Sequence, residues 1–200
     1  MKRIAITALM AMLAGAGIAK GADKPVKIGF ITTSTTPTAS TGNDMVNAVN
    51  QAVEHVGGKI GGKQIEVLFK DDGLKPELGR QKAEKLIRQD DVDGVAGFIW
   101  SNVLTAARKS VIDSGKFLIS TNPGPFEFAG KPCSPDFFSL CGQNDMVPIA
   151  LGKIMNECVV KKLYVMVPNY TAGKDIAAGL ESSFKGDVFG RDLTVFRRVI

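Results

Sequence analysis

The chain has 200 residues, its formal net charge is +5 at pH 7, and 44% of its residues are hydrophobic. Basic residues are scattered among acidic ones, without a basic stripe that carries interleaved aromatic side chains, and this argues against a nucleic-acid-binding protein. One histidine and three cysteines leave few candidates for metal binding or nucleophilic catalysis.

The first residues predict a secretory signal. Lys2 and Arg3 precede an uncharged apolar stretch over residues 4–19, and small residues follow it, although no Ala-x-Ala triplet occurs. A membrane anchor is the alternative, but the stretch is shorter than the roughly 20 residues that a span needs. We therefore expect residues 1–21 to be cleaved off and the mature protein to lie outside the cytoplasm.

Strand-like and helix-like segments then alternate along the chain. We expect strands at residues 26–33, 63–72, 93–100 and 116–122, and helices at residues 42–56, 76–90 and 101–115. Such alternation predicts an α/β fold with a parallel sheet that has helices on both faces. Open sheets of this kind bind ligands beyond the carboxyl ends of their strands, so the loops after Thr33, Asp72, Trp100 and Asn122 are the candidates for function.

A second block begins after residues 123–143, which interrupt the pattern with four prolines. We expect helices at residues 144–157 and 173–185 and strands at residues 162–168 and 193–200. Two strands and two helices bury too little apolar surface to form a stable domain alone. We therefore expect a two-lobe design, with residues 22–142 as the first lobe and residues 143–200 as a hinge, at 143–145, and an incomplete second lobe.

A glycine run at residues 57–64 comes close to a phosphate-binding loop. Gln64 stands where that motif needs Ser or Thr, and the run follows a helix and precedes a strand, so no helix N-terminus faces a phosphate. We interpret it as a flexible connection.

Three other residues are of a type that can take part in catalysis. His55 ends a predicted helix, where a capping role is ordinary because the helix dipole favours a cation there. Asp71 and Asp72 end a strand, where a general base or a metal ligand could lie, but a turn role is the more ordinary assignment. We expect no catalytic residue, no metal ion and no cofactor.

The cysteines suit an oxidising compartment. Cys133 and Cys141 flank a short loop segment and can form a disulfide, whereas Cys158 falls in an apolar pattern that predicts a buried thiol. Three pairings are possible, and we expect Cys133 with Cys141. Zinc is not expected, because the one histidine, His55, is distant in sequence from all three cysteines.

Small polar residues follow two strands that are neighbours in the predicted sheet. Ser101 and Asn102 come directly after Trp100 at the start of a helix, and Asn122 and Gly124 follow the next strand. Ser101 can cap its own helix. The same helix N-terminus can instead hold a ligand carboxylate. The residues alone leave both roles open.

The chain resembles a known family in three stretches that occur in the expected order. They read "VKIGFITTSTTPTASTGNDMVNAVNQAVEHVGGKIGGKQIEVLFKDD", "GVAGFIWSNVLTAARKSVIDSGKFLISTNPGP" and "VPNYTAGKDIAAGLESSF". They are similar to the leucine/isoleucine/valine-binding type of periplasmic solute receptor, which has the type I periplasmic binding fold and serves ABC importers. This resemblance implies a location in the periplasm.

The resemblance also implies a ligand site. In the family a serine at the start of the third helix holds the ligand carboxylate, and Ser101 matches it. A loop of small residues after the fourth strand assists, and Asn122, Pro123 and Gly124 match that loop. Gly124 stands where the amino-acid receptors carry a threonine, so one side-chain hydrogen bond would be missing.

Two further departures imply a wider pocket than leucine needs. Ala172 stands where the family often has a tyrosine, with Tyr170 two residues earlier, and Thr41 occupies a position where an aromatic residue is common. Trp100 could then form one wall. The combination resembles the branch of the family that takes up aromatic carboxylates.

The resemblance implies binding without chemistry. Two lobes would close over a small carboxylate, either a branched-chain amino acid or an aromatic acid, and the closed monomer would dock on the permease and ATPase subunits of an ABC importer at the inner membrane. A ligand-sensing regulator with the same fold is an alternative. A small secreted α/β enzyme is a second one, although the chain offers no evident catalytic groups.

Overall fold

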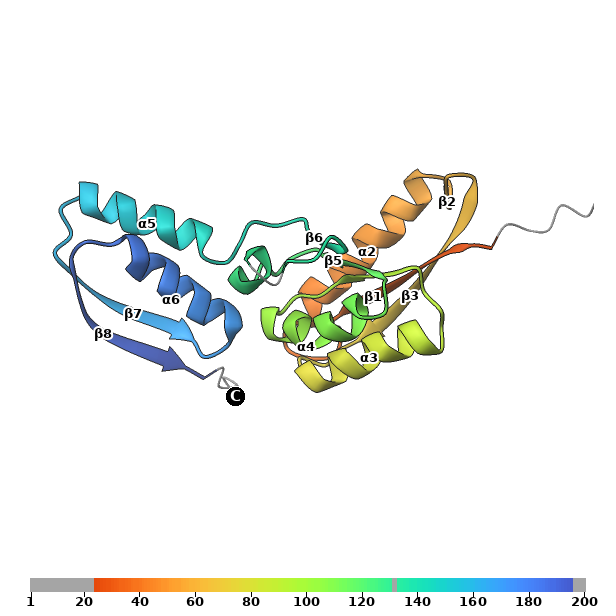
Figure 1. Ribbon diagram of the computed structural model, residues 1–200, viewed down its shortest axis with the longest axis horizontal. Coiled ribbons are helices and arrows are strands. Elements are labelled where there is room, and N and C mark those ends of the chain that lie inside the picture. Colours follow the sequence, from red (N-terminus) through yellow and green to blue (C-terminus); the bar gives the residue numbers. More distant parts are fainter. Residues whose placement is uncertain (1–23, 131–132, 196–200) are drawn as a thin grey trace, which may run out of the picture.

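A computed structural model describes residues 24–130 and 133–195 (Figure 1). The expected signal peptide, residues 1–21, lies outside the described residues. Two bodies follow one another along the chain, and we name the one from β1 to β6 the first lobe and the one from α5 to β8 the second lobe. Within the described ranges, every helix is too short or too polar to cross a bilayer.

The first lobe is a sheet of six strands in the order β2-β3-β1-β4-β5-β6. All neighbouring strands pair in parallel except β2 and β3. Its elements are β1 (Val26–Thr32), α2 (Ala39–His55), β2 (Lys59–Ile60), β3 (Lys63–Asp71), α3 (Pro76–Arg88), β4 (Gly94–Gly97), α4 (Ser101–Ile112), β5 (Phe117–Ser120), the 3-10 helix η1 (Phe126–Ala129) and β6 (Phe137–Ser139). The parallel sheet confirms the predicted fold class.

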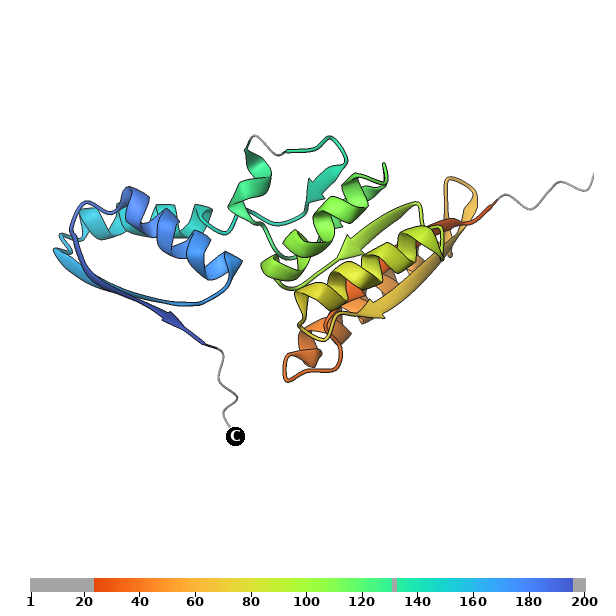
Figure 2. The same cartoon turned by 60° about the horizontal axis from the view of Figure 1, so that its bottom comes forward.

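Helices cover both faces of this sheet, with α3 and α4 on one face and α2 on the other (Figures 1 and 2). Successive side chains of β1 point alternately to these two faces of the sheet. Ile31 belongs to the main core together with residues of α3 and α4, and a Cβ on Gly29 would lie 2.7 Å from Leu86 of α3. Ile28 and Phe30 point to the opposite face, towards α2.

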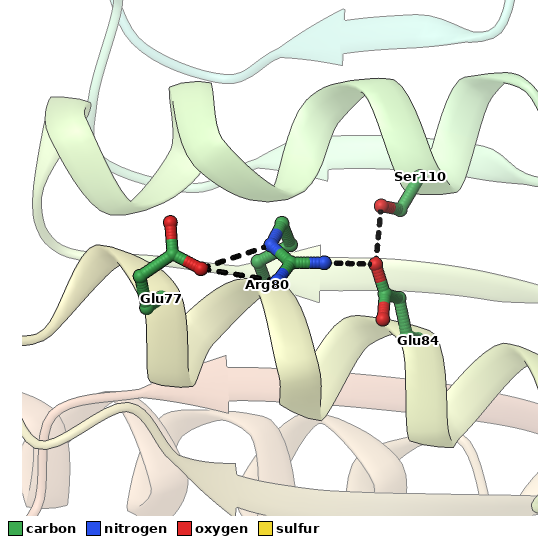
Figure 3. A network of polar contacts seen from close by, with 4 residues as sticks. All are labelled: Glu77, Arg80, Glu84 and Ser110. Carbon is green, nitrogen blue, oxygen red and sulfur yellow. Dashed lines mark hydrogen bonds and ion pairs between the residues drawn. The ribbon is translucent and has the colours of Figure 1, made fainter.

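The helices α3 and α4 pack closely because Gly79 leaves room for Val103, which lies 2.3 Å from where a Cβ would be. A polar network spans the outer side of this contact (Figure 3). Arg80 donates to Glu77 and Glu84 of its own helix, and Ser110 of α4 donates to Glu84 at 3.0 Å. The network fixes the relative position of α4, whose first residues form part of the candidate site.

An apolar groove remains between α2 and the sheet of the first lobe. Side chains of α2 and of the sheet line a cleft of about 320 Å³. Valines 49, 53 and 56 line it from the helix, and Val56 at its end is 55% exposed. His55, as expected, is the last residue of α2.

The glycine run connects α2 to β3, as predicted, and forms a hairpin that the sequence pattern did not predict. Lys59 and Ile60 pair antiparallel with Gln64 and Lys63. The two glycines between them, 61 and 62, have φ angles of 56° and 82°, which a two-residue hairpin turn requires. The edge strand β2 is the result.

The segment at residues 123–143 also carries more structure than expected, because η1 and the edge strand β6 lie within it.

The structure does not contain the expected disulfide between Cys133 and Cys141. Both are exposed free thiols, and Cys141 Sγ donates to the Thr121 carbonyl at 3.3 Å. The pairing stays a prediction for oxidising conditions.

The second lobe contains two parallel strands and two helices. Both helices lie on the same side of the strand pair (Figures 1 and 2). Its elements are α5 (Met146–Glu157), β7 (Lys162–Pro168), α6 (Thr171–Ser183) and β8 (Asp187–Thr194). The last strand begins at Asp187, six residues before the expected start, and of the predicted strand at 193–200 the residues 196–200 lie outside the described ranges. Cys158 is exposed, not buried as expected, because it follows the last residue of α5.

Candidate ligand-binding cleft

The turn from β4 into α4 has an unusual backbone that the sheet holds in place. Gly97 has a φ of 111°, and a Cβ there would lie 2.3 Å from the Ile31 carbonyl oxygen, so only glycine fits. Phe98 follows with a φ of 70°, its side chain fully buried and its amide bonded to the same carbonyl at 2.6 Å. This turn delivers Trp100 and Ser101 to the carboxyl edge of the sheet.

Trp100, not Ser101, is the N-cap residue of α4, so of the two roles left open for Ser101 the structure does not show the capping one. Ser101 is the first helical residue and is 2% exposed, and its hydroxyl oxygen accepts a hydrogen bond from Asn144 at 3.1 Å. The amides of Ser101 and Asn102 bond to no other described residue, as befits the start of a helix. They are available donors at the positive end of the helix dipole.

A cleft of about 220 Å³ lies between the two lobes at the carboxyl ends of four strands. It is lined by Leu74, Trp100, Asn102, Asn169, Tyr170, Thr194 and Val195. The Trp100 ring of the first lobe meets the Tyr170 ring of the second edge to face, with centroids 5.9 Å apart. Strand ends from both lobes thus contribute to one cleft, as the rule for open parallel sheets predicts.

The described side chains that line this cleft carry no formal charge. The Asn102 carboxamide oxygen is buried and has no hydrogen-bond partner among the described residues. Burial raises the pKa of Tyr170 above its ordinary value, so this hydroxyl stays a neutral donor at physiological pH. The described part of the cleft therefore offers aromatic surface, hydrogen-bond donors and a helix dipole.

Other predicted site residues lie around the cleft rather than on its lining. Asn122 donates from its carboxamide to the Ile99 carbonyl at 2.9 Å and so ties the ends of β5 and β4 together. Pro123 and Gly124 are buried, and a Cβ on Gly124 would lie 2.2 Å from the Gly142 carbonyl oxygen. Their role is to pack the loop behind Ser101.

Thr41 and Ala172 lie in the first turns of α2 and α6. Thr41 is exposed and Ala172 is buried, and neither lines the cleft. Of the residues that the sequence predicted, the structure places Trp100, Asn102 and Tyr170 on the cleft.

Four residues on the lining were missed. Asn169 directly precedes the predicted Tyr170 at the end of β7, so the strand-end rule alone could have found it. Leu74 reaches the cleft through a φ of 62° that the sequence gives no reason to expect. Thr194 and Val195 were missed because the predicted last strand, at residues 193–200, placed them inside a strand rather than at its carboxyl end.

Asp71 and Asp72 have the expected turn role. Asp72 is fully buried and accepts hydrogen bonds from the Thr33 hydroxyl at 2.6 Å and the Leu74 amide at 2.9 Å. Asp71 accepts from the Ser34 and Gly73 amides and the Thr35 hydroxyl.

The same surroundings shift the two carboxyl groups in opposite directions. Burial raises the pKa of Asp72, and the hydrogen bonds from Thr33 and Leu74 offset this only in part. Partial burial also acts to raise the pKa of Asp71, but its hydrogen bonds outweigh burial and lower the pKa overall.

Comparison with known proteins identifies the family. The periplasmic binding protein family matches residues 25–196 of the chain. The chain belongs to this family. Its solved members confirm the predicted type I periplasmic binding fold, and a family of this kind implies a location outside the cytoplasm.

Individual relatives of this periplasmic binding protein include receptors for two classes of ligand. Leu/Ile/Val-binding protein homolog 3 of Brucella melitensis is 24% identical over 183 residues, which are 90% of this chain and 48% of the relative. A solute binding protein of an R. palustris ABC transporter, in complex with benzoate, is 26% identical with a TM-score of 0.81, over 88% of this chain and 50% of that one. The branched-chain amino acid transporter substrate binding protein LivJ of Streptococcus pneumoniae, in complex with isoleucine, is 25% identical with a TM-score of 0.73, over 86% and 50%.

The chain thus spans about half the length of these relatives. The two solved relatives are solute-binding or substrate-binding proteins of transporters, in keeping with the predicted class.

Proposed function

We propose that the protein is the extracytoplasmic substrate-binding component of an ABC importer and captures a small carboxylate between its two lobes. The observation that carries the proposal is the cleft at the carboxyl strand ends, where Trp100 of one lobe meets Tyr170 of the other. A ligand that contacts both rings gains affinity only when the lobes come together, so it favours closure. Segment 143–145 is the proposed hinge.

The carboxylate would bind at the start of α4. The amides of Ser101 and Asn102 are the donors there, the helix dipole favours a negative charge, and the Ser101 hydroxyl adds a third donor. No lysine or arginine lines the described part of the cleft, so hydrogen bonds rather than an ion pair would hold the anion.

Among carboxylates, the described lining favours an aromatic acid over a branched-chain amino acid. Two aromatic rings at an edge-to-face distance offer matching surface for a benzoate ring. The benzoate complex of the R. palustris relative supports this choice.

A fluorescence titration tests the proposal directly. Trp100 is the single tryptophan of the chain and lines the cleft, so a bound ligand should change its emission. We expect saturable changes with benzoate and 4-hydroxybenzoate, and weaker ones or none with leucine. Tight leucine binding without any response to the benzoates would overturn the aromatic assignment, and no response to any of them would overturn the receptor function.

The anchor is tested by Ser101→Ala. Loss of a hydroxyl that donates to a charged ligand group costs about 1.5 to 3 kcal/mol, so benzoate binding should weaken about tenfold or more. Ser114→Ala is a matched control, because Ser114 follows the other end of α4 and its hydroxyl donates only to the Val111 carbonyl. An unchanged dissociation constant in Ser101→Ala would show that this hydroxyl does not contact the ligand.

A further inference from the structure

The Asn144 side chain joins three segments that meet behind the cleft. Its amide nitrogen donates to Ser101 Oγ at 3.1 Å and to the carboxylate of Asp175, on α6, at 2.9 Å. Its carboxamide oxygen accepts from the Gly124 amide at 3.3 Å, and its own backbone amide donates to the Gly124 carbonyl at 2.8 Å. One side chain thereby connects the start of α4, the loop after β5 and the second lobe.

These partners fix which way the carboxamide faces. A carboxylate oxygen of Asp175 can only accept, and the Gly124 amide can only donate. A flipped Asn144 would set its oxygen against Asp175 and its nitrogen against the Gly124 amide. The nitrogen therefore faces Ser101, and Ser101 Oγ must accept.

This constraint determines what the serine offers to a ligand. A hydroxyl has one hydrogen to donate and two lone pairs, and Asn144 occupies a lone pair. The hydrogen of Ser101 is left to point elsewhere, and a hydroxyl that accepts one hydrogen bond becomes a stronger donor in the next. A carboxylate accepts only, so it requires Ser101 in this state.

We infer that Asn144 is a positioning residue of the ligand site, which holds Ser101 as a donor for the ligand carboxylate and links it to the second lobe through Asp175. This inference rests on the proposed function and adds a residue that does not line the cleft. Asp175 also accepts from the Phe126 amide at 3.1 Å, so its carboxylate is held from the first lobe as well. Displacement of α6 relative to α4 would break the Asn144 contact to Ser101 or the one to Asp175, and the ligand site thus depends on lobe position.

A double-mutant cycle between Asn144 and Ser101 tests the inference. The variants are Asn144→Ala, Ser101→Ala and the double variant, titrated through Trp100 fluorescence with whichever of benzoate, 4-hydroxybenzoate and leucine binds the unmodified protein best. If Asn144 acts through Ser101, Asn144→Ala should weaken binding about five- to tenfold, and the double variant should bind within about twofold of Ser101→Ala. If Asn144 had a merely structural role, the fold-loss of affinity in the double variant would equal the product of the two single fold-losses.

Asn156→Ala is the matched control for general destabilisation. Its carboxamide also makes two bonds, to the Ser183 carbonyl at 2.9 Å and from the Lys185 amide at 2.8 Å, but both lie within the second lobe. The affinity of this variant should stay unchanged. Affinity losses that match those of Asn144→Ala would overturn the inference.

Asn144→Asp gives the strongest expected effect. A carboxylate in place of the amide would accept the Ser101 hydrogen, lie against Asp175 and repel an anionic ligand, so the loss should exceed that of Asn144→Ala. Equal or tighter binding would contradict the proposed geometry. Absence of binding by the unmodified protein would overturn the proposed function and this inference together, whereas normal binding with multiplicative losses would overturn the inference alone.

Discussion

The two lobes share their local construction but differ in how much they bury. The largest fully buried side chains of the described residues all belong to the first lobe, among them Ile31, Leu86 and Leu104. The buried core of the second lobe consists of Val165, Val167 and Ala177, and helices cover only one face of its strands. On the other face Met166 is 64% exposed. We therefore expect similar strand–helix units to have unequal stability when the number of layers differs.

What the lobes share is a close contact where the first strand of each passes into a helix. A Cβ on Gly42 of α2 would lie 1.9 Å from the Thr33 carbonyl oxygen, and one on Gly173 of α6 would lie 1.9 Å from the Pro168 carbonyl oxygen. Both helices therefore approach their strand end more closely than any side chain allows. A backbone oxygen cannot move aside as a flexible side chain can.

The largest expected effect is that of Gly42→Ala, which tests this shared contact. The added methyl group should lower the free energy of unfolding of the first lobe by more than about 4 kcal/mol, or prevent folding. Urea unfolding followed by Trp100 fluorescence measures it. Gly142→Ala is the control, because a Cβ there meets only the flexible Met146 sulfur, at 3.4 Å.

Gly173→Ala tests whether the two lobes unfold independently of each other. The clash is equally close, but we expect it to destabilise only the second lobe and to leave the Trp100 transition in place, while far-UV circular dichroism detects the loss of helix. Coupled loss of both signals would show that the lobes unfold as one unit.

A smaller effect is expected from a pair of core and surface truncations. Leu104→Ala removes a fully buried side chain from the first lobe and should cost about 2 to 5 kcal/mol. Met166→Ala removes a side chain of similar size from the open face of the second lobe and should change stability by about 0.5 kcal/mol or less. Equal costs, in the same urea experiment, would mean that the open face is covered in solution.

The sequence predicted the fold well where the hydrophobic pattern was regular. The helix and strand alternation from Val26 to Ser120 follows directly from periodicity, and the small size of the second block led to the expectation of two lobes. Two edge strands, β2 and β6, were missed because each has two or three residues, too short for a period to show. The position of β8 was wrong because charged residues such as Asp187 and Arg191 interrupt its apolar pattern.

The candidate site was predictable only in part. The strand-end rule pointed to the loop after Trp100, which contains Asn102, and the family resemblance pointed to Tyr170. The structure places these three residues on the cleft. The burial of Ser101 and its bond to Asn144 could not be foreseen, because they arise from contacts between segments 43 residues apart. The φ of 62° that brings Leu74 to the cleft likewise results from the Asp72 turn rather than from any propensity of leucine.

The smallest expected effect concerns two neighbouring carboxyl groups of the first lobe. The pKa of Asp71 is lowered in the folded protein, so its contribution to stability is present above the unfolded pKa and is lost as pH falls through the folded pKa. The pKa of Asp72 is raised, so its contribution is present below the unfolded pKa and is lost as pH rises through the folded pKa.

Isosteric substitutions should therefore act in opposite directions at pH 7. Asp71→Asn should lower the free energy of unfolding by about 1 kcal/mol or less, because it exchanges an acceptor for a donor in a partly solvated site. Asp72→Asn keeps the oxygen that accepts from Thr33 and Leu74 and removes a buried charge, so stability should rise slightly. Urea unfolding between pH 4 and pH 8 measures both, and changes of the same sign would contradict the assigned pKa shifts.

The groove beneath α2 has a consequence for how the protein behaves at high concentration. Its valine-rich walls are exposed to water. Release of water from such an apolar surface favours contact with any other apolar surface, whether the contact is specific or not. Self-association should consequently grow with ionic strength, since salts that strengthen the hydrophobic effect also screen the repulsion between positively charged molecules. Handling in dilute, low-salt buffer would keep the molecules apart.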